Sequence, residues 1–112
     1  MYCFTPISDM FETTESIIIQ VELAGVKKED INIELTNNYL EVSGIKRHEG
    51  LTGEEIFQRM ERPFGVFKKV FNLPKAVNRD STFASFNEGL LEIVILKKDK
   101  DDSFTLTSID IK

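Results

Sequence analysis

The sequence predicts an all-β protein, an immunoglobulin-like antiparallel β-sandwich, and two observations support this fold class. Apolar residues recur at every second position in several short segments, which is the period of a strand that buries one face. Turn-forming residues separate these segments, and many short antiparallel strands with turns between them are typical of a sandwich. The chain has 112 residues, and a core of this size rarely divides, so we expect one domain.

Residues 16–23 form the first predicted strand. Ile17, Ile19 and Val21 share one face, and Ile18 is the apolar residue that interrupts the polar face. A period of two residues indicates a strand that is half buried. We therefore expect the face of Ile17 and Ile19 to contribute to the core.

Two strands follow as a hairpin, over residues 31–36 and 39–45. Apolar and polar residues alternate in both, so each strand is expected to bury one face. Asn37 and Asn38 separate the strands, and because asparagine tolerates a positive φ, the pair predicts a tight turn.

The second half of the chain predicts three more strands. Residues 66–73 end at Pro74, which cannot donate a backbone hydrogen bond to a neighbouring strand. Residues 82–87 and 90–96 form a second hairpin. Its turn contains Gly89, because glycine adopts a positive φ without steric cost.

A long connection, residues 46–62, separates the two halves. It contains Gly50 and Gly53, yet its middle, residues 54–60, includes apolar side chains and can form a strand. A long loop in a compact domain is more often functional or bound to a partner than idle. We therefore expect this segment to take part in function.

Apolar residues return at the end of the chain, after a polar linker over residues 97–103. Ile109 and Ile111 are two residues apart and share one face of an extended segment. A linker of about a dozen residues spans roughly 30–40 Å when extended, so the pair can reach a groove of its own subunit or of a neighbour. A last strand of the same domain explains the pattern equally well, and both alternatives stay open here.

The overall charge argues against a nucleic-acid-binding protein. Lys plus Arg number 14 and Asp plus Glu number 19, which gives a net charge of −5. Nucleic-acid affinity comes mostly from basic side chains that neutralise phosphates. An acidic chain is therefore a poor candidate for that class.

Membrane and secreted classes are also disfavoured. The longest apolar runs, residues 17–19 and 93–96, are far shorter than the about 20 residues of a membrane span. The N-terminus lacks the basic and apolar parts of a signal peptide. Cys3 is the only cysteine, so there is no disulfide framework. We expect a cytoplasmic protein.

Residues for catalysis are largely missing. His48 is the only histidine, and a surface role fits its charged surroundings better than general-base catalysis, which needs a positioned nucleophile. The glycines form no phosphate-binding loop, and the acidic run at residues 99–102 lacks the glycine and the final glutamate of a calcium loop. We predict no catalytic residue, no cofactor and no metal site, which leaves recognition through apolar surface and strand edges.

Five segments match motifs of one known family in the family's order. They are Leu-Ala-Gly-Val-Lys-Lys-Glu-Asp-Ile at 23–31, Leu-Glu-Val-Ser-Gly at 40–44, Phe-Asn-Leu-Pro at 71–74, Ala-Ser-Phe-Asn-Glu-Gly-Leu-Leu at 84–91 and Ile-Asp-Ile at 109–111. The fourth is similar to the signature A-x-x-x-n-G-v-L, and the fifth matches an I-x-I/V motif. Together they resemble the small heat shock protein family, which carries the α-crystallin domain.

The resemblance implies an ATP-independent chaperone that binds partly unfolded client proteins and prevents their aggregation. It also implies that the I-x-I motif, here Ile109 and Ile111, docks into a groove between two edge strands of a neighbouring subunit. The residues expected to line that groove are Ile31, Ile33, Leu35, Phe83 and Ser85.

The resemblance further implies a homodimer, and larger oligomers beyond it. In the bacterial and plant branch of the family, the long loop adds a strand to the partner subunit. Here that strand would pair with residues 10–13 of the other chain, and it would consist of Glu55, Ile56, Phe57, Gln58 and Arg59. The alternative for the apolar members of this strand is ordinary packing within one subunit.

The resemblance divides the chain into a short arm (1–10), an α-crystallin domain (11–97) and a C-terminal extension (98–112). Family members usually have a longer apolar arm, so a short one argues against large assemblies and strong chaperone activity. Lys69 stands where the family has arginine, and lysine cannot make a bidentate pair. The rival interpretation, a sandwich domain that serves as an adaptor or co-chaperone, is disfavoured by the long loop and the I-x-I motif.

Overall fold

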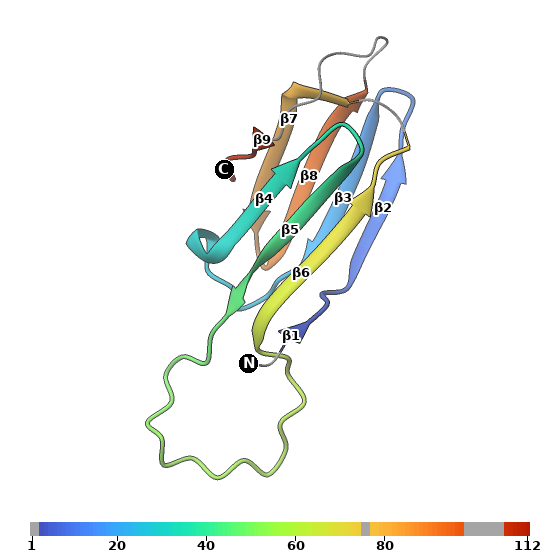
Figure 1. Cartoon of the computed structure of the whole chain (residues 1–112). Helices are drawn as coiled ribbons and strands as arrows, with labels where there is room; N and C mark the ends of the chain where they lie inside the picture. Colours follow the sequence, from blue (N-terminus) through green and yellow to red (C-terminus); the bar gives the residue numbers. More distant parts are fainter. Residues whose placement is uncertain (1–2, 75–76, 98–106) are drawn as a thin grey trace.

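The structure, a computed structural model, describes residues 3–74, 77–97 and 107–112 as a sandwich of two β-sheets (Figure 1). Its strands are β1 (Cys3–Phe4), β2 (Ser8–Glu12), β3 (Ser16–Glu22), β4 (Ile31–Leu35), β5 (Tyr39–Lys46), β6 (Gly65–Asn72), β7 (Val77–Asn87), β8 (Leu90–Lys97) and β9 (Thr107–Ser108). One sheet has the order β1-β6-β5-β4-β9, and the other has the order β2-β3-β8-β7. Neighbouring strands are antiparallel, except that β1 pairs with β6 in parallel. The predicted fold class is confirmed.

The two sheets enclose the core, and alternation along the strands decides which residues enter it. Ile17, Ile19 and Val21 of β3 are fully buried, as their shared face predicted. Phe67 of β6 is the largest of the fully buried side chains, and its ring centroid lies 5.6 Å from that of Phe4. The contact with Phe4 attaches the N-terminal segment to the core.

Gly44 of β5 allows the chain to pack closely around Phe67. A Cβ at this position would lie 2.1 Å from the backbone oxygen of Asp30 and 2.7 Å from Cζ of Phe67. Real Cβ atoms do not approach backbone oxygens so closely. Glycine is therefore required by space at this position, because the backbone before β4 passes directly over it.

Both predicted hairpins are present with turns at the predicted positions, and the two turns differ in backbone conformation. Glu88 and Gly89 have φ values of 52° and 80°, which make a type I′ turn between β7 and β8. The turn between β4 and β5 has no residue with a positive φ. Instead, the hydroxyl of buried Thr36 accepts hydrogen bonds from the backbone N–H groups of Asn38 (3.2 Å) and Tyr39 (3.1 Å). The tight turn predicted at the two asparagines is present, but the Thr36 hydroxyl supports it in place of a positive φ.

Three strand segments lie outside the ranges predicted from the sequence. β7 begins at Val77, and a change of register between Asn78 and Thr82 interrupts the alternation there. β1 and β2 add strands near the N-terminus. The expected arm, residues 1–10, therefore overlaps two strands, and its boundary falls inside β2.

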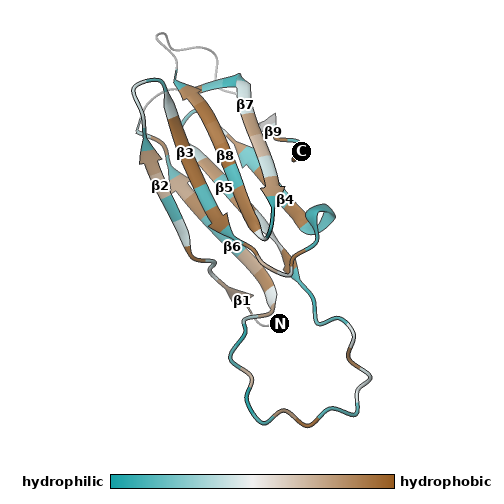
Figure 2. Ribbon diagram, turned by 180° about the vertical axis from the view of Figure 1, so that it is seen from behind, coloured by the Kyte–Doolittle hydropathy of each residue, from teal (hydrophilic) through white to brown (hydrophobic). Residues whose placement is uncertain are grey.

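Residues 47–64, here called the loop, project away from the sandwich (Figures 1 and 2). The loop contains no strand, so the strand predicted over residues 54–59 has no partner within this chain. Exchange of that strand between two copies stays a prediction.

Candidate functional site

A groove lies between the edge strands β4 and β7, which belong to opposite sheets, and residues 107–112 occupy it. These residues are here called the tail. The tail runs antiparallel beside β4, where Thr107 pairs with Leu35 and Ser108 pairs with Glu34. The N–H of Ile109 then donates to the backbone oxygen of Ile33 at 3.0 Å. These contacts extend the sheet by one short strand.

The other side of the tail meets β7 through backbone groups. Ile111 forms a parallel bridge with Ala84. The N–H of Lys112 donates to the oxygen of Ala84 at 2.9 Å, and the N–H of Phe86 donates to the oxygen of Lys112 at 3.3 Å. The tail thus connects the two sheets along an edge where β4 and β7 do not pair with each other.

Two isoleucine side chains anchor the tail. Ile109 and Ile111 are partly buried and pack against the core. Beside them is a groove of about 440 Å³, lined on the β4 side by Ile31 and Ile33 among others. An extended segment directs residues 109 and 111 to the same side, so both reach apolar surface while Asp110 stays exposed. The sequence left two interpretations of the tail open, a docking segment and a last strand of the domain. In this structure the tail has features of both: it forms a short strand beside β4, and it lies in a groove of its own subunit.

The predicted groove residues separate into two groups. Ile31, Ile33 and Leu35 lie on β4 beside the tail, and all three are buried. Phe83 and Ser85 lie on β7, but they face away from the core on the outer side of the sheet, and Phe83 is 51% exposed. Alternation explains this placement, because Ala84 between them is buried and faces inward.

Sequence reasoning missed Ala84 and Phe86 as the β7 partners of the tail. Both contacts use backbone atoms, for which side-chain chemistry gives no signal. The alternation of β7 could have found the correct face, since Ala84 and Phe86 share it. The polar linker predicted before the tail lies, beyond Lys97, outside the described residues.

The loop exposes a second set of apolar side chains. Ile56 is 86% exposed, and Phe57, Met60 and Leu51 are also largely open to solvent. The predicted exchange residues, Glu55 to Arg59, are all exposed and none of them is in a strand. Arg59 forms an ion pair with Glu61 at 3.8 Å. Both side chains are exposed, and exposed ion pairs contribute little to stability.

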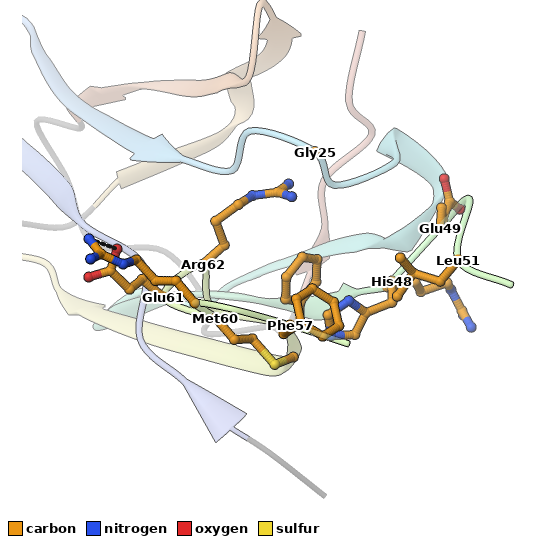
Figure 3. Close-up of a pocket in the computed structure, with 11 residues that line it drawn as sticks. Gly25, His48, Glu49, Leu51, Phe57, Met60, Glu61 and Arg62 are labelled. Carbon is orange, nitrogen blue, oxygen red and sulfur yellow. Dashed lines mark ion pairs between the residues drawn. The ribbon is translucent and has the colours of Figure 1, made fainter. Parts of the chain in front are cut away.

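An aromatic and cationic cluster holds the base of the loop. The His48 ring stacks on Phe64 with centroids 3.6 Å apart. Lys46 Nζ and the Arg62 guanidinium carbon lie 5.3 Å and 5.0 Å from the Phe64 ring centroid, within cation–π range. Burial, together with the nearby charge of Arg62, lowers the pKa of Lys46. Figure 3 shows the pocket beside this cluster, bordered by His48, Phe57, Met60 and Arg62.

Glu55 organises a turn within the loop. Its carboxylate accepts hydrogen bonds from the N–H of Thr52 (2.7 Å), the hydroxyl of Thr52 (3.1 Å) and the N–H of Gly53 (2.9 Å). These bonds, led by the one from the Thr52 backbone, lower the pKa of Glu55 to about 2. The first residue of the predicted exchange strand is therefore held in a turn in the single chain.

The edge of β2 is the remaining strand edge of interest. β2 pairs with β3 on one side, and its other side has no strand partner among the described residues. Met10 and Phe11 are exposed along it, and Ile7 is exposed just before it. An edge of this kind is able to accept another strand.

The part of the chain that the structure describes contains no cluster of three or more His, Cys, Asp or Glu side chains arranged to hold a metal ion. The described residues contain one short 3₁₀ helix, Lys28–Asp30, and no helix long and apolar enough to cross a membrane.

Comparison with known proteins agrees with this geometry. Residues 9–112 match the model of the Hsp20/alpha crystallin family. The chain belongs to this family. The resemblance to small heat shock proteins is therefore confirmed.

The curated relatives carry heat shock and spore protein names. The chain is 35% identical over 95 residues to spore protein SP21 of Stigmatella aurantiaca, covering 85% of this chain and 56% of that protein. It is 30% identical over 103 residues to heat shock protein 16 of Schizosaccharomyces pombe, covering 88% and 71%. The chain spans about half to three-fifths of the length of several relatives, for example 48% of the 22.7 kDa class IV heat shock protein of Pisum sativum.

Solved structures of the family have the same architecture. Heat shock protein 16.0 from Schizosaccharomyces pombe superimposes with a TM-score of 0.80 at 30% identity, covering 89% of this chain and 93% of that chain. The hspA protein of Xanthomonas axonopodis gives a TM-score of 0.77 at 28% identity, covering 88% and 98%. The α-crystallin sandwich is therefore the established fold of this chain.

Proposed function

We propose that this protein is an ATP-independent chaperone that binds partly unfolded proteins and keeps them from aggregating. The observation that supports this most directly is the groove between β4 and β7, where an extended apolar segment docks through backbone bonds and two isoleucines. Such a site accepts a sequence by its extended shape and its apolar side chains, so it suits unfolded chains of many kinds. Membership of the Hsp20/alpha crystallin family supports the same proposal.

The tail is proposed to dock on a neighbouring subunit as well as on its own. The contacts made within one chain can be made between two chains, because they involve only the backbone of β4 and β7 and two side-chain positions. Oligomers formed in this way would bind clients with higher avidity. The net charge of −5 would help to keep a loaded complex in solution.

A homodimer is proposed to form by exchange of residues Glu55 to Arg59 onto the open edge of β2. Two features support this pairing: the β2 edge has no partner among the described strands, and Ile56 and Phe57 are exposed on the loop. Exchange would require the turn held by Glu55 to open. Replacing Ile56 and Phe57 with serine should convert dimers to monomers by sedimentation equilibrium, whereas Leu51→Ser, outside the exchanged segment, should not.

The chaperone proposal is tested with a heat-labile enzyme whose aggregation is followed by light scattering. Added in stoichiometric amount without ATP, the protein should reduce scattering, and adding ATP should not improve the effect. Full aggregation in the presence of a severalfold excess would reject the proposal. A folded protein of similar mass and charge serves as the control for non-specific crowding.

A further inference from the structure

The outer face of the β2-β3-β8-β7 sheet carries a continuous apolar row. The strand registers pair Phe11 with Ile18, Ile18 with Val94, and Val94 with Phe83. These four residues, here called the outer row, therefore lie side by side across all four strands. Phe11 is 45% exposed and Phe83 is 51% exposed, while Ile18 and Val94 are partly exposed. Figure 2 views the molecule from this side, with β2, β3, β8 and β7 in front.

The other sheet has no such row across four of its described strands: its outer apolar row is Ile45, Val66 and Cys3 on β5, β6 and β1. On its outer face, exposed Val70 pairs with Glu41, which in turn pairs with Glu34. The next row pairs Lys68 with Ser43, and Lys68 contacts Glu41 at 3.1 Å. A polar outer face is what a solvated sheet requires. What distinguishes the outer row is therefore its length, four strands, and its two largely exposed phenylalanines.

The outer row has an acidic border on one side. The next row of the same face contains Asp9, Gln20 and Glu92, and Glu22 follows one row further on. Gln20 donates to Glu92 at 2.8 Å, which fixes the position of that carboxylate. Asp9 and Glu22 are exposed. A cation, Lys112, lies at the far end of the row, where its Nζ is 5.8 Å from the Phe83 ring centroid.

We propose that the outer row binds extended segments of partly unfolded clients in which apolar side chains stand next to lysine or arginine. This assignment rests on the proposed chaperone function and names the class of segment recognised. Adjacent strands lie about 4.8 Å apart, so the row is roughly 15 Å long. An extended chain of about five residues covers that length and presents two or three side chains to it. A neighbouring basic residue then reaches the acidic border, where opposite charge favours binding.

Charge also distinguishes this occupant from a second copy of the chain. The chain has a net charge of −5, and the outer face itself contributes acidic side chains in the described rows. Contact between two such faces brings charge of the same sign together, whereas a basic segment removes the repulsion. The outer row lies on the opposite face of β7 from the groove, because Ala84 faces inward while Phe83 faces outward, and the tail approaches the row through the Lys112 side chain over Phe83.

The test uses three fluorescent peptides with the same alternating apolar centre, flanked by lysine, serine or glutamate, and measures their dissociation constants by anisotropy. The lysine peptide should bind about tenfold more tightly than the glutamate peptide at low salt, and this preference should disappear near 1 M salt, where charges are screened within about 3 Å. Equal affinity for all three peptides would overturn the proposal.

Two double variants separate the apolar and acidic parts of the site. Ile18→Thr with Val94→Thr keeps β-branched residues in the sheet and should weaken binding of the lysine peptide about tenfold. Asp9→Asn with Glu92→Gln should remove the preference for lysine and leave the affinity of the serine peptide unchanged. Val70→Thr, on the outer face of the other sheet, is the matched control. It should change neither the affinity of the lysine peptide nor the preference for lysine. Unchanged binding in the first variant, or an equal loss in the control, would overturn the proposal.

Other occupants give different results in the same experiments. If Ile109→Ala with Ile111→Ala changes peptide affinity as much as the outer-row variant does, the groove is the site and the proposal fails. If the outer-row variant instead reduces the mass of the assembly without changing peptide affinity, a second copy covers the row and the proposal fails. In the aggregation assay, a wild-type protein without effect would reject the proposed function. An outer-row variant that suppresses aggregation as well as the wild type would reject only this inference.

Discussion

Replacing Ile109 and Ile111 together with alanine should release the tail from the groove. Both side chains are partly buried against the core, and full burial of an isoleucine contributes about 1.5–3 kcal/mol. Since the two are only partly buried, we expect the pair of truncations to weaken docking by about 2–3 kcal/mol. A loss of this size raises the open fraction of the tail by roughly 30- to 150-fold, because about 1.4 kcal/mol corresponds to a factor of ten.

Amide hydrogen exchange measures this opening directly. The N–H groups of Ile109 and Lys112 donate to the backbone oxygens of Ile33 and Ala84, so both should be protected in the wild-type chain and exchange faster in the double variant. The thermal midpoint of the sandwich should change little, because the buried residues of β3 and β8 do not depend on the tail. Ser108→Ala, at an exposed position of the tail, is the control. Unchanged exchange at both amides would show that backbone bonds alone hold the tail and would refute the assigned role of the isoleucines.

Two further predictions concern stability and pH. Gly44→Ala should lower the free energy of unfolding, measured by urea titration, by at least about 1–3 kcal/mol, because the added Cβ overlaps the Asp30 oxygen and Phe67. Ser43→Ala is the control. Equal stability of the two variants would contradict the close approach of Asp30 and Phe67 to Gly44. The pKa of Glu55 is lowered to about 2 in the turn, so the order that its carboxylate gives the loop is present above its ordinary pKa and is lost as the pH falls through about 2. The NMR shifts of the Thr52 and Gly53 amides should therefore titrate with a midpoint near pH 2. A midpoint near pH 4.5 would contradict the turn. Amide shifts that are the same in Glu55→Gln as in the wild-type chain would also contradict it.

Strands with one fully buried face could be predicted from the sequence, and edge segments could not. β3, β4 and β8 alternate because each buries every second side chain, and their predicted ranges agree with the structure. β2 lies at an edge and its residues are mostly exposed, so burial imposes little pattern on them. The first part of β7 was missed because its register changes between Asn78 and Thr82, which breaks the period of two.

The candidate site divides in the same way. The tail and its β4 partners could be predicted because Ile109, Ile111, Ile31 and Ile33 are apolar residues at fixed spacings. The β7 side depends on the backbone of Ala84 and Phe86, and backbone hydrogen bonds leave no trace in side-chain identity. The outer row joins four residues from distant parts of the chain. Only the strand registers reveal it, although Ile18 was already visible as an apolar residue on a polar face.

The groove and the outer row differ in how readily a client reaches them. The tail already occupies the groove, and a short tether gives it an effective concentration on the order of millimolar, so a client must displace it before binding there. The outer row is less obstructed, since the contact that the structure gives between it and the tail is that of the Lys112 side chain over Phe83 at one end of the row. Clients should therefore meet the outer row first, and release of the tail should add the groove as a second contact. A client segment bound at both places would gain affinity without any change in the sandwich itself. Clients could then bind whether the tail is docked or released, and release of the tail would increase their affinity.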